Sequence, residues 1–263
     1  MRFDDQFALV MGAGPGLGAG LARGFGARGG RLALVARSAA SLSASAEEAR
    51  RGGSEPLTLA ADVTSVSDVR RVVDTVMEAW GQIDILVNNA FAAPRRRTLL
   101  EMEETDLERW RETVEIGGFG TLLACRFVAP HMVQAERGSI VNVTSMSSRV
   151  APPGRSDYAS GKAQAHKIAQ ALAGELGPHG VRVNCVAPGP ILSDALLNFY
   201  RTEADRLGVT YEEELARHTQ ASALRRFSTN DEVANAVMFL ASDLASAITG
   251  AVLDVNSGHF FTV

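Results

Sequence analysis

A short apolar run that leads directly into a cluster of glycines limits the folds open to this chain more than any other segment. Residues 7–11 are apolar, the glycine-rich turn follows as Gly12-Ala13-Gly14-Pro15-Gly16-Leu17-Gly18, and a helical pattern continues to about Arg28. Glycine lets a backbone approach a pyrophosphate, and the N–H groups and dipole of a helix N-terminus attract its charge. The segment predicts a strand, a phosphate-binding turn and a helix. A glycine turn without a ligand is the alternative.

Six more apolar runs follow at intervals that leave room for helices between them. They are residues 31–36, 57–61, 83–87, 138–145, 181–186 and 251–255. Strands that alternate with helices predict a parallel sheet with helices on both faces. We therefore expect an α/β fold with a Rossmann-type, doubly wound sheet of seven parallel strands. No linker, repeat or break in composition divides residues 1–263, which predicts a single domain.

Composition argues against several classes of partner. The net charge of -4 and the pI near 5.8 give no footprint for nucleic acid or an anionic membrane. No stretch approaches 18 consecutive apolar residues, and Asp4 and Asp5 precede any apolar segment. Cys125 and Cys185 lie far apart in apolar segments, which predicts buried thiols with no disulfide or metal site. We expect a cytoplasmic protein.

The second strand ends where a dinucleotide-binding fold contacts the adenosine ribose. An acidic residue there would bind the 2′-hydroxyl of NAD, whereas an arginine accommodates the 2′-phosphate of NADP. This chain has Arg37 and Ser38 at that place, and a guanidinium can bind a phosphate through two N–H groups. The residues favour NADP(H) over NAD(H); the alternative is a surface arginine at the start of a helix.

The next two strands also end in polar residues. Asp62 and Val63 follow the third strand, where Asp62 can meet the adenine of the cofactor. The competing interpretation is local, because Ser65 and Asp68 resemble the capped start of a helix and Asp62 can serve that turn alone. The fourth strand ends in Asn88-Asn89-Ala90, whose amide side chains can hold neighbouring backbone or ligand.

A tyrosine and a lysine stand four residues apart in the helical segment that contains Tyr158 and Lys162. Residues i and i+4 are neighbours on a helix face, so an ammonium is expected beside a phenol. A nearby cation should lower the pKa of Tyr158 from about 10 toward working pH, which suits a general acid or base. Only Lys162 and Lys167 among the 26 basic residues are lysine, which favours a required lysine over two residues that merely share a face.

Two further segments bear on the expected site. The fifth strand brings Ser145 to the carboxyl edge of the sheet, where its hydroxyl can hold a substrate oxygen or cap a loop. Residues 190–227 show no strand pattern and predict a mobile helical lid, although any packed helix shows a similar apolar stripe. Its apolar residues are Leu192, Leu196, Leu197, Phe199 and Tyr200.

Two segments between the fourth and fifth strands stand out by composition. Arg95-Arg96-Arg97 is expected in a loop, as solvated surface or, alternatively, as a contact for an anionic partner. Residues 105–132 predict a long helical segment that is interrupted by Gly117, Gly118 and Gly120. Glycine inside a helix costs stability, so we expect a kink or a close approach to another backbone there.

Together these residues resemble the single-domain short-chain dehydrogenase/reductase family along nearly the whole chain. The resemblance lies in Gly12-x-x-x-Gly16-x-Gly18, in Asn88-Asn89-Ala90, and in Ser145 placed thirteen residues before Tyr158-x-x-x-Lys162. It implies hydride transfer between a nicotinamide cofactor and a carbonyl or alcohol, without a metal. Tyr158 would exchange a proton with the substrate oxygen, Ser145 would hold that oxygen, and Lys162 would bind the nicotinamide ribose and lower the pKa of Tyr158.

The same resemblance assigns further cofactor contacts and an oligomeric state. Asp62 matches the adenine contact. The segment with Pro188, Gly189, Ile191 and Ser193 matches the loop on the nicotinamide side. The family also implies a homotetramer built on its long helices and C-terminal segment.

Two positions depart from the family pattern. Gly117 replaces the asparagine that usually holds a water of the proton relay, and Phe91 replaces the glycine that usually follows Asn-Asn-Ala. We expect an active enzyme with an altered relay and a reshaped pocket. Its substrate would be a small, mostly apolar ketone or secondary alcohol. The alternative is a dinucleotide-binding sensor or interaction protein that has lost efficient catalysis.

Overall fold

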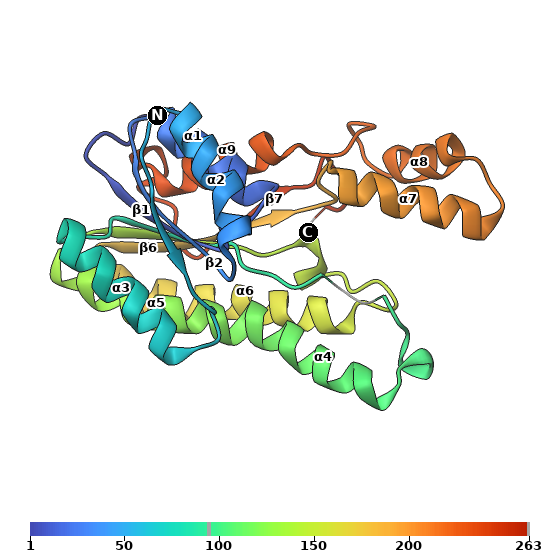
Figure 1. Ribbon diagram of the computed structural model, residues 1–263, viewed down its shortest axis with the longest axis horizontal. Coiled ribbons are helices and arrows are strands. Elements are labelled where there is room, and N and C mark those ends of the chain that lie inside the picture. Colours follow the sequence, from blue (N-terminus) through green and yellow to red (C-terminus); the bar gives the residue numbers. More distant parts are fainter. Residues whose placement is uncertain (94–95, 262–263) are drawn as a thin grey trace.

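Seven parallel strands form one sheet in the order β3-β2-β1-β4-β5-β6-β7, as the sequence predicts (Figure 1). The computed structural model describes residues 1–93 and 96–261. The strands are β1 (Phe7–Met11), β2 (Arg31–Ala36), β3 (Leu57–Ala60), β4 (Ile85–Asn88), β5 (Gly138–Val143), β6 (Val181–Pro188) and β7 (Val252–Val255). β4 begins two residues later than expected, β5 ends before Ser145, and β6 continues to Pro188. The order reverses between β1 and β4, where doubly wound sheets bind ligands.

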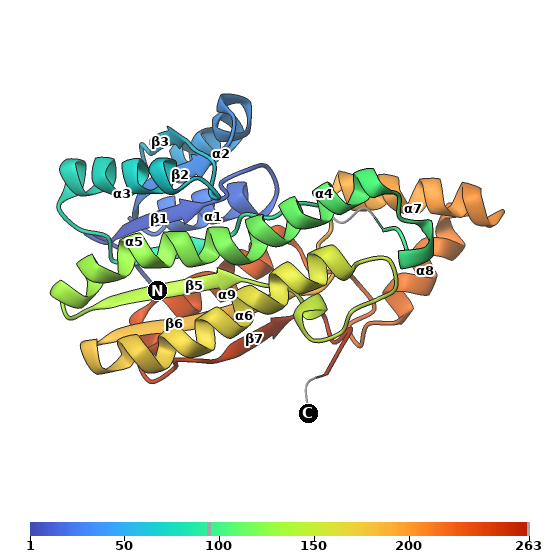
Figure 2. The same ribbon diagram turned by 90° about the horizontal axis from the view of Figure 1, so that it is seen from below.

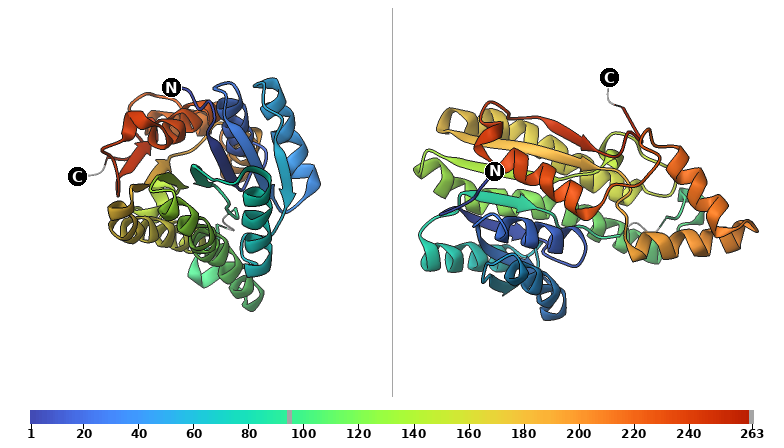
Figure 3. Two further views of the ribbon diagram at one scale, coloured as in Figure 1. Left: turned by 90° about the vertical axis from the view of Figure 1, so that its left-hand side faces the viewer. Right: turned by 90° about the horizontal axis from the view of Figure 1, so that it is seen from above.

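Helices cover both faces of this sheet, and Figure 3 shows the three layers end-on. One face carries α1 (Leu17–Gly26), α2 (Ala39–Arg51) and α9 (Asn230–Ala241). The other carries α3 (Val66–Trp80), α4 (Glu104–Val114), α5 (Gly120–Gln134) and α6 (Ser156–Leu176) (Figure 2). Short 3-10 turns span Leu99–Glu101, Met146–Ser148, Gly177–His179 and Asp243–Ala245.

The inner strands of the sheet are buried on both faces, which divides the apolar core in two. Alternate strand residues point to opposite sides. Ala8 and Val10 of β1 therefore join the core beneath α1 and α9, whereas Leu9 and Met11 join the core beneath α3, α5 and α6. Cys125 and Cys185 are buried free thiols, as predicted, and burial raises the pKa of each to about 12.

α4 and α5 are joined by a π-helical turn, Glu115–Phe119, that contains two of the predicted glycines. A Cβ atom on Gly117 would lie 3.0 Å from the backbone of Gly161 in α6, so the expected close approach of two backbones is confirmed. The joined helix Glu104–Gln134 is long and apolar enough to cross a membrane by composition. However, 61% of its apolar window is buried inside the protein, as in the core helix of a soluble protein.

The segment expected to form the lid is helical. It contains α7 (Asp194–Leu207) and α8 (Tyr211–Gln220), which pack on each other and extend beyond the carboxyl end of the sheet (Figures 1 and 2). Tyr200 of α7 is buried between the rings of His218 and Phe227, at centroid distances of 4.5 and 5.7 Å. The apolar stripe of α7 therefore holds α8 and the following chain, in addition to facing the sheet edge.

Candidate active site

The glycine turn after β1 is built around backbone that no side chain would tolerate. Gly12 has φ +94°, and a Cβ atom there would lie 2.4 Å from the backbone nitrogen of Ala90. Gly16 caps α1 with φ +85°, a conformation that L side chains rarely adopt. These two glycines let the turn fold tightly against the end of β4 and lead directly into the helix.

The same turn presents free N–H groups to an anion. Leu17 and Gly18 open α1, whose first turn has neither a side-chain cap nor an acidic residue. A Cβ atom on Gly14 would meet nothing within 4 Å, so this glycine faces open space. Unsatisfied N–H groups and a positive helix end beside open space fit a bound pyrophosphate. The residues present therefore suit the phosphates of a dinucleotide.

Two asparagines fasten the end of β4 beside this turn. The Asn89 amide donates to the carbonyl oxygen of Gly12 at 2.7 Å. The Asn88 amide donates to Oδ1 of Asn142 on β5 at 2.9 Å. The Asn89 bond confirms that an amide ties neighbouring backbone, and it holds the end of β4 against the glycine turn. Asn88 instead joins β4 to a side chain of β5.

Arg37 and Ser38 lie at the carboxyl end of β2, on the adenosine side of the turn. Ser38 caps α2, and its hydroxyl accepts from the Ser41 N–H at 3.2 Å. Arg37 is exposed and lies 3.6 Å from Glu112 of α4, a loose ion pair between two solvated groups. Within the described part of the chain, this 3.6 Å contact is the only ion pair of Arg37, so its guanidinium can turn toward a phosphate.

Asp62 takes the local role that the capping pattern offered as the alternative. Its carboxylate accepts from the backbone N–H and hydroxyl of Thr64, at 2.8 and 2.7 Å. The Ser65 hydroxyl caps α3 by accepting from the Asp68 N–H, as the sequence predicts. The Asp62 N–H donates to Asp68, and Val63 is buried. The Asp62 carboxylate thus stabilises the turn before α3. Its contact with adenine stays a prediction.

Tyr158, Lys162 and Ser145 come together at the carboxyl edge of the sheet. Lys162 is only 4% exposed, and its ammonium donates to the carbonyl oxygen of Val143 at 2.7 Å. That nitrogen lies 5.8 Å from the centre of the Tyr158 ring. Ser145 is buried and its hydroxyl accepts from the Ser147 N–H at 3.1 Å, so it also caps a short turn.

The pKa of the tyrosine differs from the sequence expectation. Burial raises the pKa of Tyr158 above its usual value, and only the Ser145 hydroxyl and the positive charge of Arg155 oppose the shift. Burial also lowers the pKa of Lys162 to about 8. The prediction that Lys162 lowers the tyrosine pKa toward working pH is therefore wrong for this arrangement. The cause is desolvation, which outweighs a cation turned toward Val143.

The segment after β6 closes the other side of the site. The Gly189 N–H donates to Val255 of β7 at 3.2 Å, directly after Pro188. Ile191 pairs with Ser228 in an isolated parallel bridge. Ser193 caps α7 by accepting from the Leu196 N–H. These residues lead the chain from the sheet edge into the lid helices.

Phe91 lies beside the reacting groups, as its departure from the family pattern suggests. Its ring meets the Tyr158 ring edge-on, with centroids 6.5 Å apart and an interplanar angle of 82°. The Lys162 nitrogen lies 6.0 Å from the same ring, and Phe91 remains 58% exposed. An accessible aromatic face therefore borders the tyrosine and the lysine, and this supports the expected reshaping of the pocket.

Arg155 is a residue near the site that the motifs did not single out. It caps α6, and its charge acts on the phenols of both Tyr158 and Tyr200. Its place in the turn directly before the Tyr158 helix was a usable signal. In the arginine run, Arg96 and Arg97 belong to the loop that leads to α4, whereas Arg95 lies outside the described residues.

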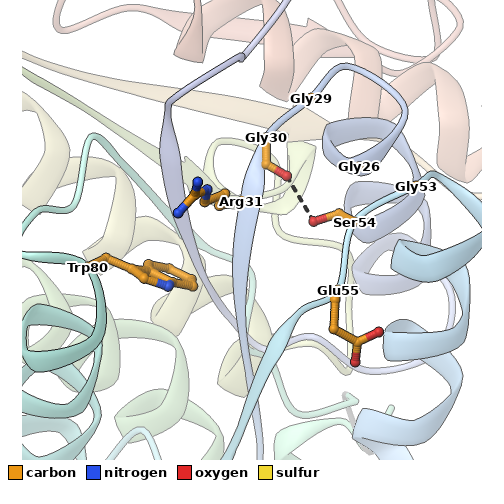
Figure 4. A pocket seen from close by; sticks show the side chains of 8 residues that line it. All are labelled: Gly26, Gly29, Gly30, Arg31, Gly53, Ser54, Glu55 and Trp80. Carbon is orange, nitrogen blue, oxygen red and sulfur yellow. Dashed lines mark hydrogen bonds between the residues drawn. The ribbon is translucent and has the colours of Figure 1, made fainter.

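A hollow of about 390 Å³ lies at the opposite edge of the sheet. Figure 4 shows Arg31 and Trp80 facing it, with glycine backbone along its rim. Arg31 begins β2 and Trp80 ends α3, so this hollow is at the amino ends of the strands. It contains none of the predicted site residues and is separate from the candidate active site.

Comparison with known proteins agrees with the site geometry. A family model described as enoyl-(acyl carrier protein) reductase matches residues 12–259. The chain belongs to the short-chain dehydrogenase/reductase family. It is similar to galactitol 2-dehydrogenase (L-tagatose-forming) from Cereibacter sphaeroides, 35% identical over 260 residues that cover 98% of this chain and 96% of that protein. As a member of this family, it is an oxidoreductase that acts on CH–OH or C=O groups.

Two solved structures extend the similarity to the fold. Levodione reductase superposes with a TM-score of 0.90 at 28% identity, and the match covers 98% of each chain. An NAD+-bound xylitol dehydrogenase superposes with a TM-score of 0.89 at 25% identity and covers 97% of this chain and 99% of that one. The doubly wound sheet and its nicotinamide cofactor are thus family features of this protein.

Proposed function

We propose that the protein transfers a hydride between NADP(H) and a mostly apolar ketone or secondary alcohol. The observation that carries the proposal is the meeting of Ser145, Tyr158 and Lys162 at the carboxyl edge of the sheet. The uncapped glycine turn opens onto the same edge at the crossover between β1 and β4. This arrangement places a proton donor beside a site suited to a dinucleotide.

The chemistry divides between cofactor and protein. A bound nicotinamide supplies or accepts the hydride. Tyr158 gives its phenol proton to the substrate oxygen in reduction, and its raised pKa keeps that proton in place at neutral pH. Ser145 donates a hydrogen bond to the same oxygen. Lys162 binds the nicotinamide ribose, for which its ammonium turns away from Val143.

The preference for NADP(H) rests on Arg37. Its guanidinium is exposed at the end of β2 and held only by the 3.6 Å contact with Glu112. A phosphate offers a stronger, charge-assisted and bidentate partner. The remaining proposed contacts are Ser38, Asp62 and Val63 near the adenosine, Asn89 and Ala90 below the nicotinamide, and Pro188, Gly189, Ile191 and Ser193 beside it.

The apolar character of the substrate is supported by Phe91, whose accessible ring borders Tyr158, and by apolar side chains of the lid segment. Leu192 is exposed directly before α7, and Phe199 of α7 carries the Arg96 guanidinium over its ring. Closing α7 and α8 over these groups would exclude water from the reacting atoms.

We further propose a cytoplasmic homotetramer that packs along α4 and α5. Leu107, Phe119 and Leu122 on these helices are exposed in the single chain, and a second copy would bury them.

The test is turnover of a panel of apolar ketones with NADPH, compared between the wild-type protein and Tyr158→Phe. The variant should bind NADPH normally and lose roughly 100-fold or more in kcat, because its general acid is absent. A protein that binds NADPH but reduces no ketone and oxidises no alcohol would instead support the sensor alternative. That alternative finds no support among the relatives.

A further inference from the structure

Two arginines lie in neighbouring loops at the N-terminal end of the helix that carries Tyr158. Arg155 is the N-cap residue of α6, directly before the first helical residue, and Tyr158 lies in the first turn of that helix. Arg96 comes from the loop after β4. A Cβ atom on Gly154, which precedes Arg155, would lie 3.0 Å from the Arg96 carbonyl carbon, so the two loops pack backbone to backbone.

Arg96 is held in a defined direction. Its backbone is in the left-handed region with φ 60°, an uncommon conformation for a residue other than glycine. Its guanidinium carbon lies 3.5 Å from the centre of the Phe199 ring on α7. A guanidinium stacked in this way keeps the N–H groups on its edge free to donate.

The two charges act on each other. Solvent still reaches Arg96, yet the surrounding side chains and the charge of Arg155 lower its pKa. Glu203 offsets part of this repulsion, but its carboxylate is bonded to Arg206. Among residues 1–93 and 96–261, no carboxylate forms an ion pair with the guanidinium of Arg155. By contrast, Arg97 in the same loop is paired with Asp106.

This excess of positive charge is unusual for a site that otherwise presents aromatic and aliphatic side chains. Two guanidiniums that repel each other are stabilised when an anion binds between them, and charge-assisted bonds to an oxyanion are strong where solvent is partly excluded. Arg155 is the N-cap residue of the helix whose first turn carries Tyr158, so the anion site and the reacting oxygen lie at the same end of α6.

We propose that the substrate is an apolar ketone or alcohol that carries an oxyanion, a carboxylate or a phosphate, and that Arg155 and Arg96 bind this group. The apolar body lies between Phe91 and Phe199, and the reacting carbon faces Tyr158. This inference rests on the proposed function, whose substrate class it narrows.

The experiment uses ketones that share one scaffold and differ in charge. The probes are 4-acetylbenzoate, its neutral amide 4-acetylbenzamide, and 4-acetylphenyl phosphate, each with NADPH and the full-length protein. kcat/KM and dissociation constants by calorimetry are measured for wild type, Arg155→Gln, Arg155→Lys and Arg96→Gln. Arg51→Gln on the exposed end of α2 removes the same charge away from the site and is the matched control.

We expect the acid to exceed the amide in kcat/KM and affinity by roughly ten- to a hundredfold, the range of a charged hydrogen bond. Arg155→Gln should bring this ratio close to one, Arg155→Lys should retain part of it, and Arg51→Gln should leave it unchanged. The ratio cancels any effect of the Arg155 charge on Tyr158 that both substrates share. A phosphate that exceeds the carboxylate identifies the oxyanion as a phosphate, and the reverse order identifies a carboxylate.

The experiment gives different results if the oxyanion site is wrong and if the proposed reductase activity is wrong. Equal kcat/KM for acid and amide, with good turnover of both, would overturn the oxyanion site and leave the ketone reductase intact. Stronger calorimetric binding of the acid that depends on Arg155, without turnover, would support the oxyanion site and refute the reductase. Equal binding of acid and amide would overturn the site whatever the activity.

Discussion

Replacing Arg37 with glutamine tests how this protein distinguishes its two possible cofactors. The 2′-phosphate is the only chemical difference between NADPH and NADH, and Arg37, at the end of β2, is the residue that we propose binds it. Arg37→Gln keeps a polar side chain of similar reach and removes the charge. The affinity for NADPH should fall, and the affinity for NADH should stay within about twofold.

The magnitude follows from the two partners that compete for the guanidinium. A charged hydrogen bond to phosphate contributes about 1.5–3 kcal/mol. Binding requires Arg37 to leave Glu112, and a 3.6 Å pair between side chains that are 59% and 43% exposed is worth at most about 1 kcal/mol. The net loss in the variant is about 0.5–3 kcal/mol, which corresponds to a roughly two- to 160-fold weaker NADPH complex.

Fluorescence titration of each purified variant with NADPH and with NADH measures this change. Glu112→Gln is the matched control, because it frees Arg37 and should tighten NADPH binding by up to about fivefold. An Arg37→Gln protein with an unaltered ratio of the two dissociation constants would refute the assignment. So would a wild-type protein that prefers NADH.

Three further substitutions test the site and its packing. Lys162→Met should abolish activity yet raise the free energy of unfolding at pH 7 by about 3 kcal/mol, because burial lowers the Lys162 pKa from 10.5 to about 8. The wild type should gain stability between pH 8 and 10.5, where the unfolded chain binds more protons, and the variant should lose this rise in pH-dependent denaturation. Gly117→Ala should cost about 1–3 kcal/mol in urea unfolding, because its Cβ would press on α6 at 3.0 Å. Phe91→Ala should raise the KM of bulky apolar ketones roughly two- to tenfold, since an aromatic contact is lost.

Each of these three predictions would be contradicted by a specific result. A Lys162→Met protein less stable than wild type would mean that the lysine is not strained by burial. Gly174→Ala on α6 is the control for Gly117, because its Cβ would meet nothing within 4 Å and should be neutral or stabilising. Equal losses at the two glycines would refute the packing argument. An unchanged KM in Phe91→Ala would remove the ring from the substrate site.

Local patterns in the sequence were sufficient for most of the architecture. The strand, glycine turn and helix at residues 7–26 depend on neighbours in the chain, and so does the cap of α3 by Ser65. Period and spacing also placed Tyr158 and Lys162 on one helix. The parallel order of the sheet followed from alternating strands and helices, because that alternation permits few other arrangements.

Contacts between distant segments decided what those residues do. Lys162 turns to Val143, nineteen positions away, and burial raises the Tyr158 pKa where spacing alone predicted a fall. Gly117 meets Gly161, and Arg96 meets the loop of Arg155, through loops that no periodicity relates. Helix and strand patterns in a sequence reflect which local backbone geometry is favoured and which side chains become buried. Desolvation and charge interactions depend on distances across the folded chain, so only the tertiary structure sets the pKa values and brings the two arginines together.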